Sequence, residues 1–78
     1  MLRYELIENT DEFVSYRYFP EGEALFGTLT VRKRDKDVIE QKVAPNDDFK
    51  WCFWKLLNRI EEFIDNSHFE EKGIIAWY

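Results

Sequence analysis

The chain has 78 residues, of which 45% are hydrophobic and 18% aromatic, and its formal net charge at pH 7 is −5. A chain of this length is expected to form one domain, residues 1–78, with an aromatic core that needs neither a metal nor a disulfide. The negative charge opposes binding to nucleic-acid phosphates and to anionic membranes, so neither is an expected partner.

Four strands are predicted at residues 2–7, 13–19, 25–33 and 38–43, because hydrophobic and polar side chains alternate there. Short polar connections join these segments, which is typical of an antiparallel meander. Tyr16 and Tyr18 are expected to pack beneath a helix, and Ile39 and Val43 are expected to face inward. Gly27 marks either a β-bulge or the close approach of a neighbouring side chain.

One helix is predicted from about residue 47 to residue 66, because an Asn-Asp-Asp segment at residues 46–48 offers side chains that can cap its start. At about 100° per residue, apolar side chains gather on one arc of this helix. The arc consists of Phe49, Phe53, Leu56, Leu57, Ile60, Phe63 and Ile64.

A fifth strand is predicted at residues 74–78, which are apolar and rich in β-forming side chains. Antiparallel pairing with the first strand is preferred, because the helix would return the chain to the correct end of the sheet. Parallel pairing beside the fourth strand is the alternative. The expected fold class is α+β. It is a two-layer sandwich of the order β-β-β-β-α-β, with one long helix packed on one face of the sheet.

Trp51 and Trp54 project away from the apolar arc of the predicted helix. In one interpretation, the loop around Pro45 or the segment 74–78 covers both indoles, and they are structural. In the other, Trp51, Trp54 and Asn58 form a stripe at i, i+3 and i+7 that binds a protein partner or a second copy of the chain. The sheet face away from the helix is a further candidate surface, with apolar side chains at Ile7, Phe13, Phe19 and Phe26.

Residues suited to catalysis are sparse in this chain. His68 is the only histidine, and it is expected in a surface turn rather than in a metal or proton-transfer site. The sequence contains no glycine-rich phosphate loop, nucleophile elbow or paired-cysteine motif. No catalytic, cofactor-binding or metal-binding residue is therefore predicted, and the protein is not expected to be an enzyme. The basic residues at 32–36 are expected to form a charged hairpin tip rather than a nucleic-acid platform.

The sequence favours a cytoplasmic, non-enzymatic protein-interaction domain. Its one cysteine, Cys52, is predicted to be buried, and neither a secretory signal nor a membrane span is expected. Trp51, Trp54 and Asn58 are the candidate contact residues, with a homodimer among the possibilities. The alternative is an acidic, inhibitor-like protein that occupies a basic site on a host protein.

Several segments resemble the pattern of a known group of proteins. They are Tyr-Phe-Pro-Glu-Gly-Glu at 18–23, Gly-Thr-Leu-Thr-Val at 27–31, Asn-Asp-Asp-Phe-Lys-Trp at 46–51 and Lys-Gly-Ile-Ile-Ala-Trp-Tyr at 72–78. Together they look like a small uncharacterised family of bacterial proteins, mainly from Gram-positive organisms, and the match extends over nearly the whole chain. This resemblance implies a stand-alone cytoplasmic domain in which Ala76, Trp77 and Tyr78 belong to the fold. It implies no catalytic residue and no ligand.

Overall fold

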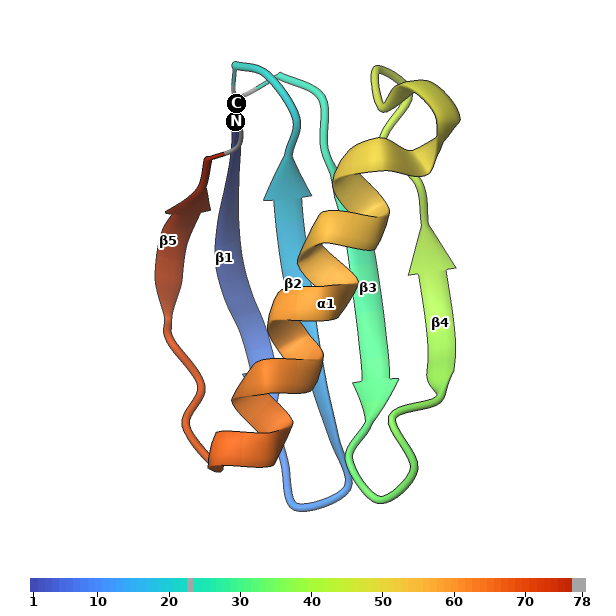
Figure 1. The fold of residues 1–78 in the computed structure, drawn as a ribbon. Coiled ribbons are helices and arrows are strands. Elements are labelled where there is room, and N and C mark those ends of the chain that lie inside the picture. The colour runs from blue at the N-terminus through green and yellow to red at the C-terminus, as the bar shows by residue number, and fades with distance from the viewer. Residues whose placement is uncertain (23, 77–78) are drawn as a thin grey trace.

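The computed structural model of the protein, which describes residues 1–22 and 24–76, has a five-stranded antiparallel sheet with one helix across one face (Figure 1). The strands are β1 (Leu2–Asn9), β2 (Phe13–Phe19), β3 (Gly27–Arg32), β4 (Val38–Lys42) and β5 (Lys72–Ile75). A short 3₁₀ turn, η1 (Asp48–Lys50), precedes helix α1 (Trp51–Asn66). The predicted α+β sandwich is therefore confirmed.

The strand order in the sheet is β4-β3-β2-β1-β5, so β1 to β4 form a meander and α1 carries the chain back to β1. β5 is antiparallel to β1, with Ile75 opposite Leu2 and Gly73 opposite Tyr4. The preferred pairing of the last strand is thus confirmed, and parallel pairing beside β4 is wrong. β5 begins earlier than predicted, and the final residues of the predicted strand, Trp77 and Tyr78, lie outside the described residues.

The core lies between α1 and the sheet face that α1 covers. Alternation along the strands and the 3.6-residue period of the helix bring two apolar surfaces together. The sheet contributes Leu2, Tyr4, Val14, Tyr16, Tyr18, Leu29, Val31 and Ile75, and α1 contributes Cys52, Phe53, Leu56, Leu57, Ile60 and Phe63. The predicted position of Tyr16 and Tyr18 beneath the helix is confirmed, as is the burial of Cys52.

Two buried tyrosines fasten the connection that follows α1. The Tyr4 hydroxyl donates to the carboxylate of Glu70 at 2.7 Å, and the Tyr16 hydroxyl donates to the Glu70 carbonyl at 2.6 Å. The backbone N–H of Leu6 donates to the carbonyl of Glu71 at 2.6 Å. Burial, reinforced by the Glu70 hydrogen bond, raises the pKa of Tyr4 to about 12, so its hydroxyl stays protonated and able to donate. These bonds direct the chain from α1 into β5.

Two glycines allow the backbone to approach tyrosine rings closely. A Cβ atom added at Gly27 would lie 2.5 Å from Tyr18 Cε1 and 2.5 Å from the Lys42 carbonyl oxygen. A Cβ atom at Gly73 would lie 2.5 Å from Tyr4 Oη. For Gly27, the interpretation as a point of close approach is confirmed, because β2 and β3 pair there without a register shift.

The prediction that Ile39 faces inward is wrong, since this residue is 45% exposed. The register between β3 and β4 shifts beside Val31, which pairs with Val38 and leaves Ile39 as the extra residue of a bulge. One inserted residue reverses which side chains face the core. Val38 consequently packs against the core, and Val43 does so as predicted.

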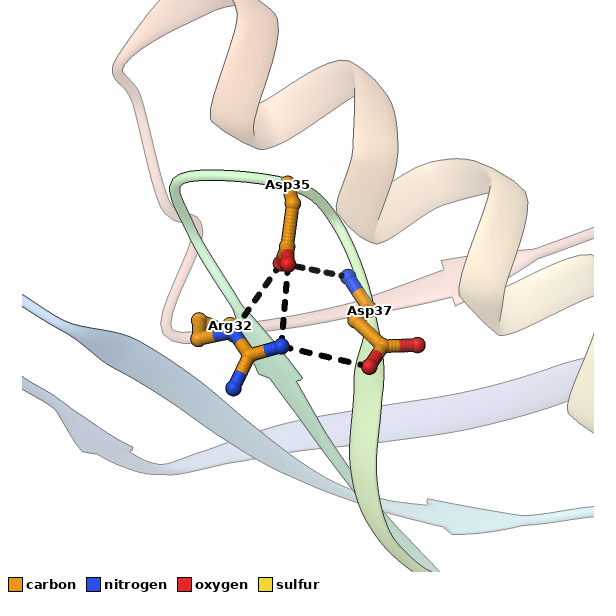
Figure 2. A network of polar contacts seen from close by, with 3 residues as sticks. All are labelled: Arg32, Asp35 and Asp37. Carbon is orange, nitrogen blue, oxygen red and sulfur yellow. Dashed lines mark hydrogen bonds and ion pairs between the residues drawn. The ribbon is translucent and has the colours of Figure 1, made fainter.

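The connection between β3 and β4 is a charged tip that one arginine holds together (Figure 2). Arg32 donates to both carboxylate oxygens of Asp35, at 3.1 and 2.9 Å, and to Asp37 at 3.3 Å. The Arg32 guanidinium lowers the pKa of the Asp35 carboxyl to about 2. Lys36 forms an ion pair with Asp65 of α1 at 2.5 Å. The charged hairpin tip is therefore confirmed, and acidic partners neutralise two of its cations.

Candidate interaction site

Asp47 fixes the start of α1. Its carboxylate is buried, and it accepts the backbone N–H of Cys52 at 2.8 Å and that of Phe53 at 2.9 Å. The Tyr18 hydroxyl donates to Asp47 at 3.0 Å and accepts the backbone N–H of Ala44 at 3.0 Å. Such a carboxylate satisfies N–H groups that a helix start leaves unpaired, and it complements the positive end of the helix dipole. The predicted cap is confirmed, and Asp47 provides it.

Between this cap and the helix, the chain passes through two residues in the left-handed conformation. Phe49 and Lys50 both have φ of 58°. This conformation costs a non-glycine residue of order 1–3 kcal/mol. The helix consequently begins at Trp51, and the prediction that Phe49 belongs to the apolar arc is wrong. The Phe49 side chain is 97% exposed. Because its backbone is not helical, the 100° spacing of helix side chains does not direct it toward the core.

Both tryptophans at the start of α1 are half-exposed, Trp51 at 53% and Trp54 at 51%. The Trp54 ring stands edge-on to Phe53 at 5.3 Å, and the Lys55 ammonium lies 5.1 Å from the Trp51 ring. Asn58 is exposed too. Among residues 1–22 and 24–76, the loop around Pro45 and the described part of the segment 74–78 leave about half of each indole exposed, so the predicted stripe is open there. Trp77 and Tyr78, which the covering interpretation also invoked, lie outside the described residues.

Phe49, Trp51 and Trp54 together make the aromatic patch of this molecule. From their exposed fractions, the three side chains present roughly 300–500 Å² of surface. The largest apolar patch of a typical monomer covers about 300–600 Å², and such patches are often functional. One side of a standard protein interface covers about 800 Å², so the aromatic patch is large enough to form the centre of one.

A hollow of about 370 Å³ opens beside the aromatic patch, and we call it the acidic hollow. Its walls include Pro20, Glu21, Asn46, Asp48, Phe49 and Trp51. Glu21 and Asp48 are exposed, and neither makes an ion pair with any described residue. The Oδ1 atom of Asn46 is enclosed and has no hydrogen-bond partner. A buried acceptor without a donor is uncommon in folded proteins and unfavourable by about 1–3 kcal/mol.

On the sheet face away from α1, the predicted aromatic side chains are largely covered, although Ile74, opposite Arg3 in the β1–β5 pair, is 58% exposed. Phe19 is buried, and its ring lies 5.8 Å from that of Phe26. The Arg3 guanidinium lies 4.0 Å from the Phe19 ring, and that of Arg17 lies 5.1 Å from the Phe26 ring. Of the four apolar side chains predicted there, only Ile7 is exposed. Cations cover the aromatic rings, which favours the aromatic patch as the candidate site.

His68 and Cys52 lie at opposite ends of α1. His68 is exposed beyond the end of α1, and no group of metal-binding side chains occurs within residues 1–22 and 24–76. Cys52 is buried, which raises the pKa of its thiol to about 11 and keeps it protonated and weakly nucleophilic. In the part of the chain that the structure describes, no helix has the length and apolar character of a membrane span.

Sequence reasoning identified Trp51, Trp54 and Asn58 but missed Phe49 and the acidic hollow. The hollow joins the connection after β2 to the segment before α1, and these lie far apart in the sequence. The acidic segment at residues 46–48 was recognised only as a cap. Comparison of the chain with models of protein families, with curated proteins and with solved structures finds no match. The resemblance to a bacterial family stays a prediction, and function is inferred from the surface itself.

Proposed function

We propose that the protein is a non-enzymatic interaction domain that binds a protein partner, or a second copy of itself, through the aromatic patch and Asn58. The observation that carries this proposal is Phe49, a large apolar side chain that is 97% exposed on a left-handed backbone. Exposure of so large an apolar side chain is unfavourable for an isolated domain, and Phe49 is not part of the core. Burial of the ring against a partner would offset that cost.

The two tryptophans are suited to provide most of the binding energy. Each indole has one neighbour, Phe53 for Trp54 and Lys55 for Trp51, and a tryptophan has only two side-chain torsions to order on binding. Tryptophan is enriched among interface residues whose truncation weakens binding by about 2 kcal/mol or more. We therefore expect Trp51→Ala and Trp54→Ala each to weaken partner binding by roughly 30-fold.

The polar groups of the interior serve structure, which supports a non-catalytic role. Asp47 binds two helix N–H groups and the Tyr18 hydroxyl. Tyr4 and Tyr16 bind Glu70. These groups are therefore committed to holding the connections at the two ends of α1.

Site-specific photo-crosslinking tests the proposal. The photoreactive amino acid p-benzoylphenylalanine replaces Phe49 in cells that naturally contain the protein, and the same replacement at Glu40, an exposed residue of β4, provides the control. We expect a specific adduct from position 49 only. Its partner is then purified, and its affinity is measured for the native chain and for the Trp51→Ala, Trp54→Ala and Asn58→Ala variants. Sedimentation equilibrium shows whether the partner is a second copy.

Two results would contradict the proposal. One is the same set of adducts from positions 49 and 40. The other is an unchanged affinity after both tryptophan substitutions in variants whose unfolding is cooperative. An acidic inhibitor that binds through charge alone would instead lose affinity steeply with salt. On α1, that alternative is weakened because Asp65 is paired with Lys36, and Glu62 lies 3.7 Å from Arg59.

A further inference from the structure

We propose that the sheet face away from α1 binds an acidic, extended segment of a partner protein. This surface is separate from the aromatic patch, so the inference goes beyond the proposed function and does not depend on it. Its basis is a line of residues, one from each strand, that crosses the whole sheet and is rich in cations. We call this line the basic row, and it consists of Lys72, Glu5, Arg17, Thr28 and Lys42.

The pairing of the strands places the basic row on one face of the sheet. Glu5 lies opposite Lys72 on one side and opposite Arg17 on the other. Thr28 in turn lies opposite Arg17 and opposite Lys42. Successive side chains of a strand point to opposite faces, and α1 covers the face of the alternate residues (Figure 1). Those alternate, buried residues are Tyr4, Tyr16, Tyr18 and Leu29. The basic row therefore faces away from α1.

The basic row carries more positive than negative charge. Its one carboxylate, Glu5, is shared by two arginines, since it lies 2.9 Å from Arg3 and 3.7 Å from Arg17. Lys42 and Lys72 are exposed, and neither forms an ion pair within the part of the chain that the structure describes. The whole chain has a net charge of −5, but salt screens exposed charges beyond about 8 Å. The local excess of cations therefore attracts an acidic segment to this face.

Two cations of the basic row converge on one aromatic ring. The Arg17 guanidinium lies 5.1 Å from the centroid of the Phe26 ring, and the Lys42 ammonium lies 5.5 Å from the same centroid. Like charges that share a ring repel each other. A carboxylate brought in by a partner would offset this repulsion and would accept charge-assisted hydrogen bonds from both side chains. The convergence marks the point at which an acidic side chain is best accommodated.

The spacing of the charges favours a polypeptide over a single-stranded nucleic acid. Neighbouring strands lie about 4.8 Å apart, so successive cations of the basic row are about 10 Å apart, which is the span of three residues in an extended chain. Glu5 lies between two of the cations, and Glu8 and Glu40 lie at the two ends of the next row. These carboxylates would repel an unbroken line of phosphates. A polypeptide can carry acidic residues opposite the cations and neutral or basic residues opposite the carboxylates.

The test uses hexaglutamate with blocked ends as the probe and two-dimensional NMR of the ¹⁵N-labelled protein as the measurement. Blocked hexaglutamine is the neutral control, and hexathymidylate represents single-stranded nucleic acid. We expect hexaglutamate to bind with a dissociation constant of order 0.1–1 mM at about 20 mM salt, with shifts of the Arg17, Thr28 and Lys42 amides. The affinity should fall at least about fivefold at roughly 300 mM salt. Hexaglutamine should bind at least about tenfold more weakly than hexaglutamate, and hexathymidylate at least about threefold more weakly.

Variants locate the binding on the basic row. Lys42→Gln and Lys72→Gln should each weaken hexaglutamate binding by about two- to fivefold, as expected for solvated charge pairs. Lys42→Arg keeps the charge and should keep the affinity. Arg34→Gln removes one positive charge from the connection between β3 and β4, outside the row, and should leave the affinity unchanged. Trp54→Ala should leave it unchanged as well, because Trp54 lies on α1.

Four results would overturn the inference. They are the absence of saturable shifts along the basic row up to about 10 mM hexaglutamate, equal binding of hexaglutamine, equal weakening by Arg34→Gln and Lys42→Gln, and binding of hexathymidylate as tight as that of hexaglutamate. The last result would assign this face to nucleic acid. The proposed function fails separately. If hexaglutamate binds as expected but the purified partner does not respond to Trp51→Ala or Trp54→Ala, the aromatic patch is not the interface, and the basic row keeps its assignment.

Discussion

Replacement of Asp47 by alanine should destabilise the protein strongly, although this residue lies in a loop and adds nothing to the apolar core. The substitution leaves the N–H groups of Cys52 and Phe53 without their acceptor and removes the acceptor of the Tyr18 hydroxyl. Loss of a helix cap alone costs about 0.5–2 kcal/mol, and a buried polar group left unpaired costs about 1–3 kcal/mol. We therefore expect Asp47→Ala to lower the free energy of unfolding by about 3 kcal/mol.

For a chain of this length, the total free energy of unfolding is expected to be about 4–12 kcal/mol, so a loss of 3 kcal/mol is a large fraction. It should lower the melting temperature by roughly 12–24 °C. Urea unfolding followed by far-ultraviolet circular dichroism measures the change. Asp47→Asn keeps one acceptor oxygen and should cost about 1–2 kcal/mol.

A double-mutant cycle with Tyr18→Phe shows whether the cap and the tyrosine act together. Because the Tyr18 hydroxyl and the Asp47 carboxylate bind each other, the two substitutions should be non-additive by about 1 kcal/mol. A change below about 0.5 kcal/mol for Asp47→Ala would refute the reasoning, since it would place this residue among ordinary surface positions.

Other predictions concern alkaline pH, thiol reactivity and backbone packing. Because the pKa of Tyr4 is raised to about 12 in the fold, its stabilising effect should be complete below the unfolded value near 10 and be lost as the pH rises through 12. Phenolate absorbance at 295 nm should therefore rise together with the loss of circular dichroism, and ionisation of Tyr4 at its ordinary pH in a folded chain would contradict this. The Cys52 thiol should react with a disulfide reagent slowly in the native protein and rapidly in urea, and equal rates would show that it is accessible. Gly73→Ala should lower the free energy of unfolding by about 1–3 kcal/mol, because the added Cβ meets the Tyr4 ring. Gly22→Ala meets no atom within 4 Å, so it should be destabilising only through the strain of a positive φ.

Sequence periodicity predicted most of this fold because most of it is regular. Alternation assigned Tyr16 and Tyr18 to the covered face of the sheet, and polar clusters marked the turns. The pairing of the last strand followed from the direction in which a helix returns the chain. The prediction was wrong for Ile39, because a β-bulge depends on how β4 pairs with β3. The sequence of β4 alone carries no periodic signal for it.

The candidate site was predictable in part. Trp51 and Trp54 stood out because they broke the pattern of their helix, and that deviation depends only on the helix being present. Phe49 was assigned wrongly because its place depends on which of three neighbouring polar residues caps α1, and all three have capping side chains. The hollow was not predictable, because it requires that Glu21 and Asp48 approach each other in space.

At the start of α1, the residues that stabilise the fold differ from the residue that is exposed, and this difference affects which substitutions the protein tolerates. Asp47 and Tyr18 hold the architecture, whereas Phe49 projects from it without supporting anything inside. Substitutions at position 49 should therefore change the free energy of unfolding little. A residue that tolerates the positive φ, such as glycine or asparagine, should even raise it. Related proteins could therefore differ in the side chain at position 49, and so in the surface exposed before α1, while the fold stays the same.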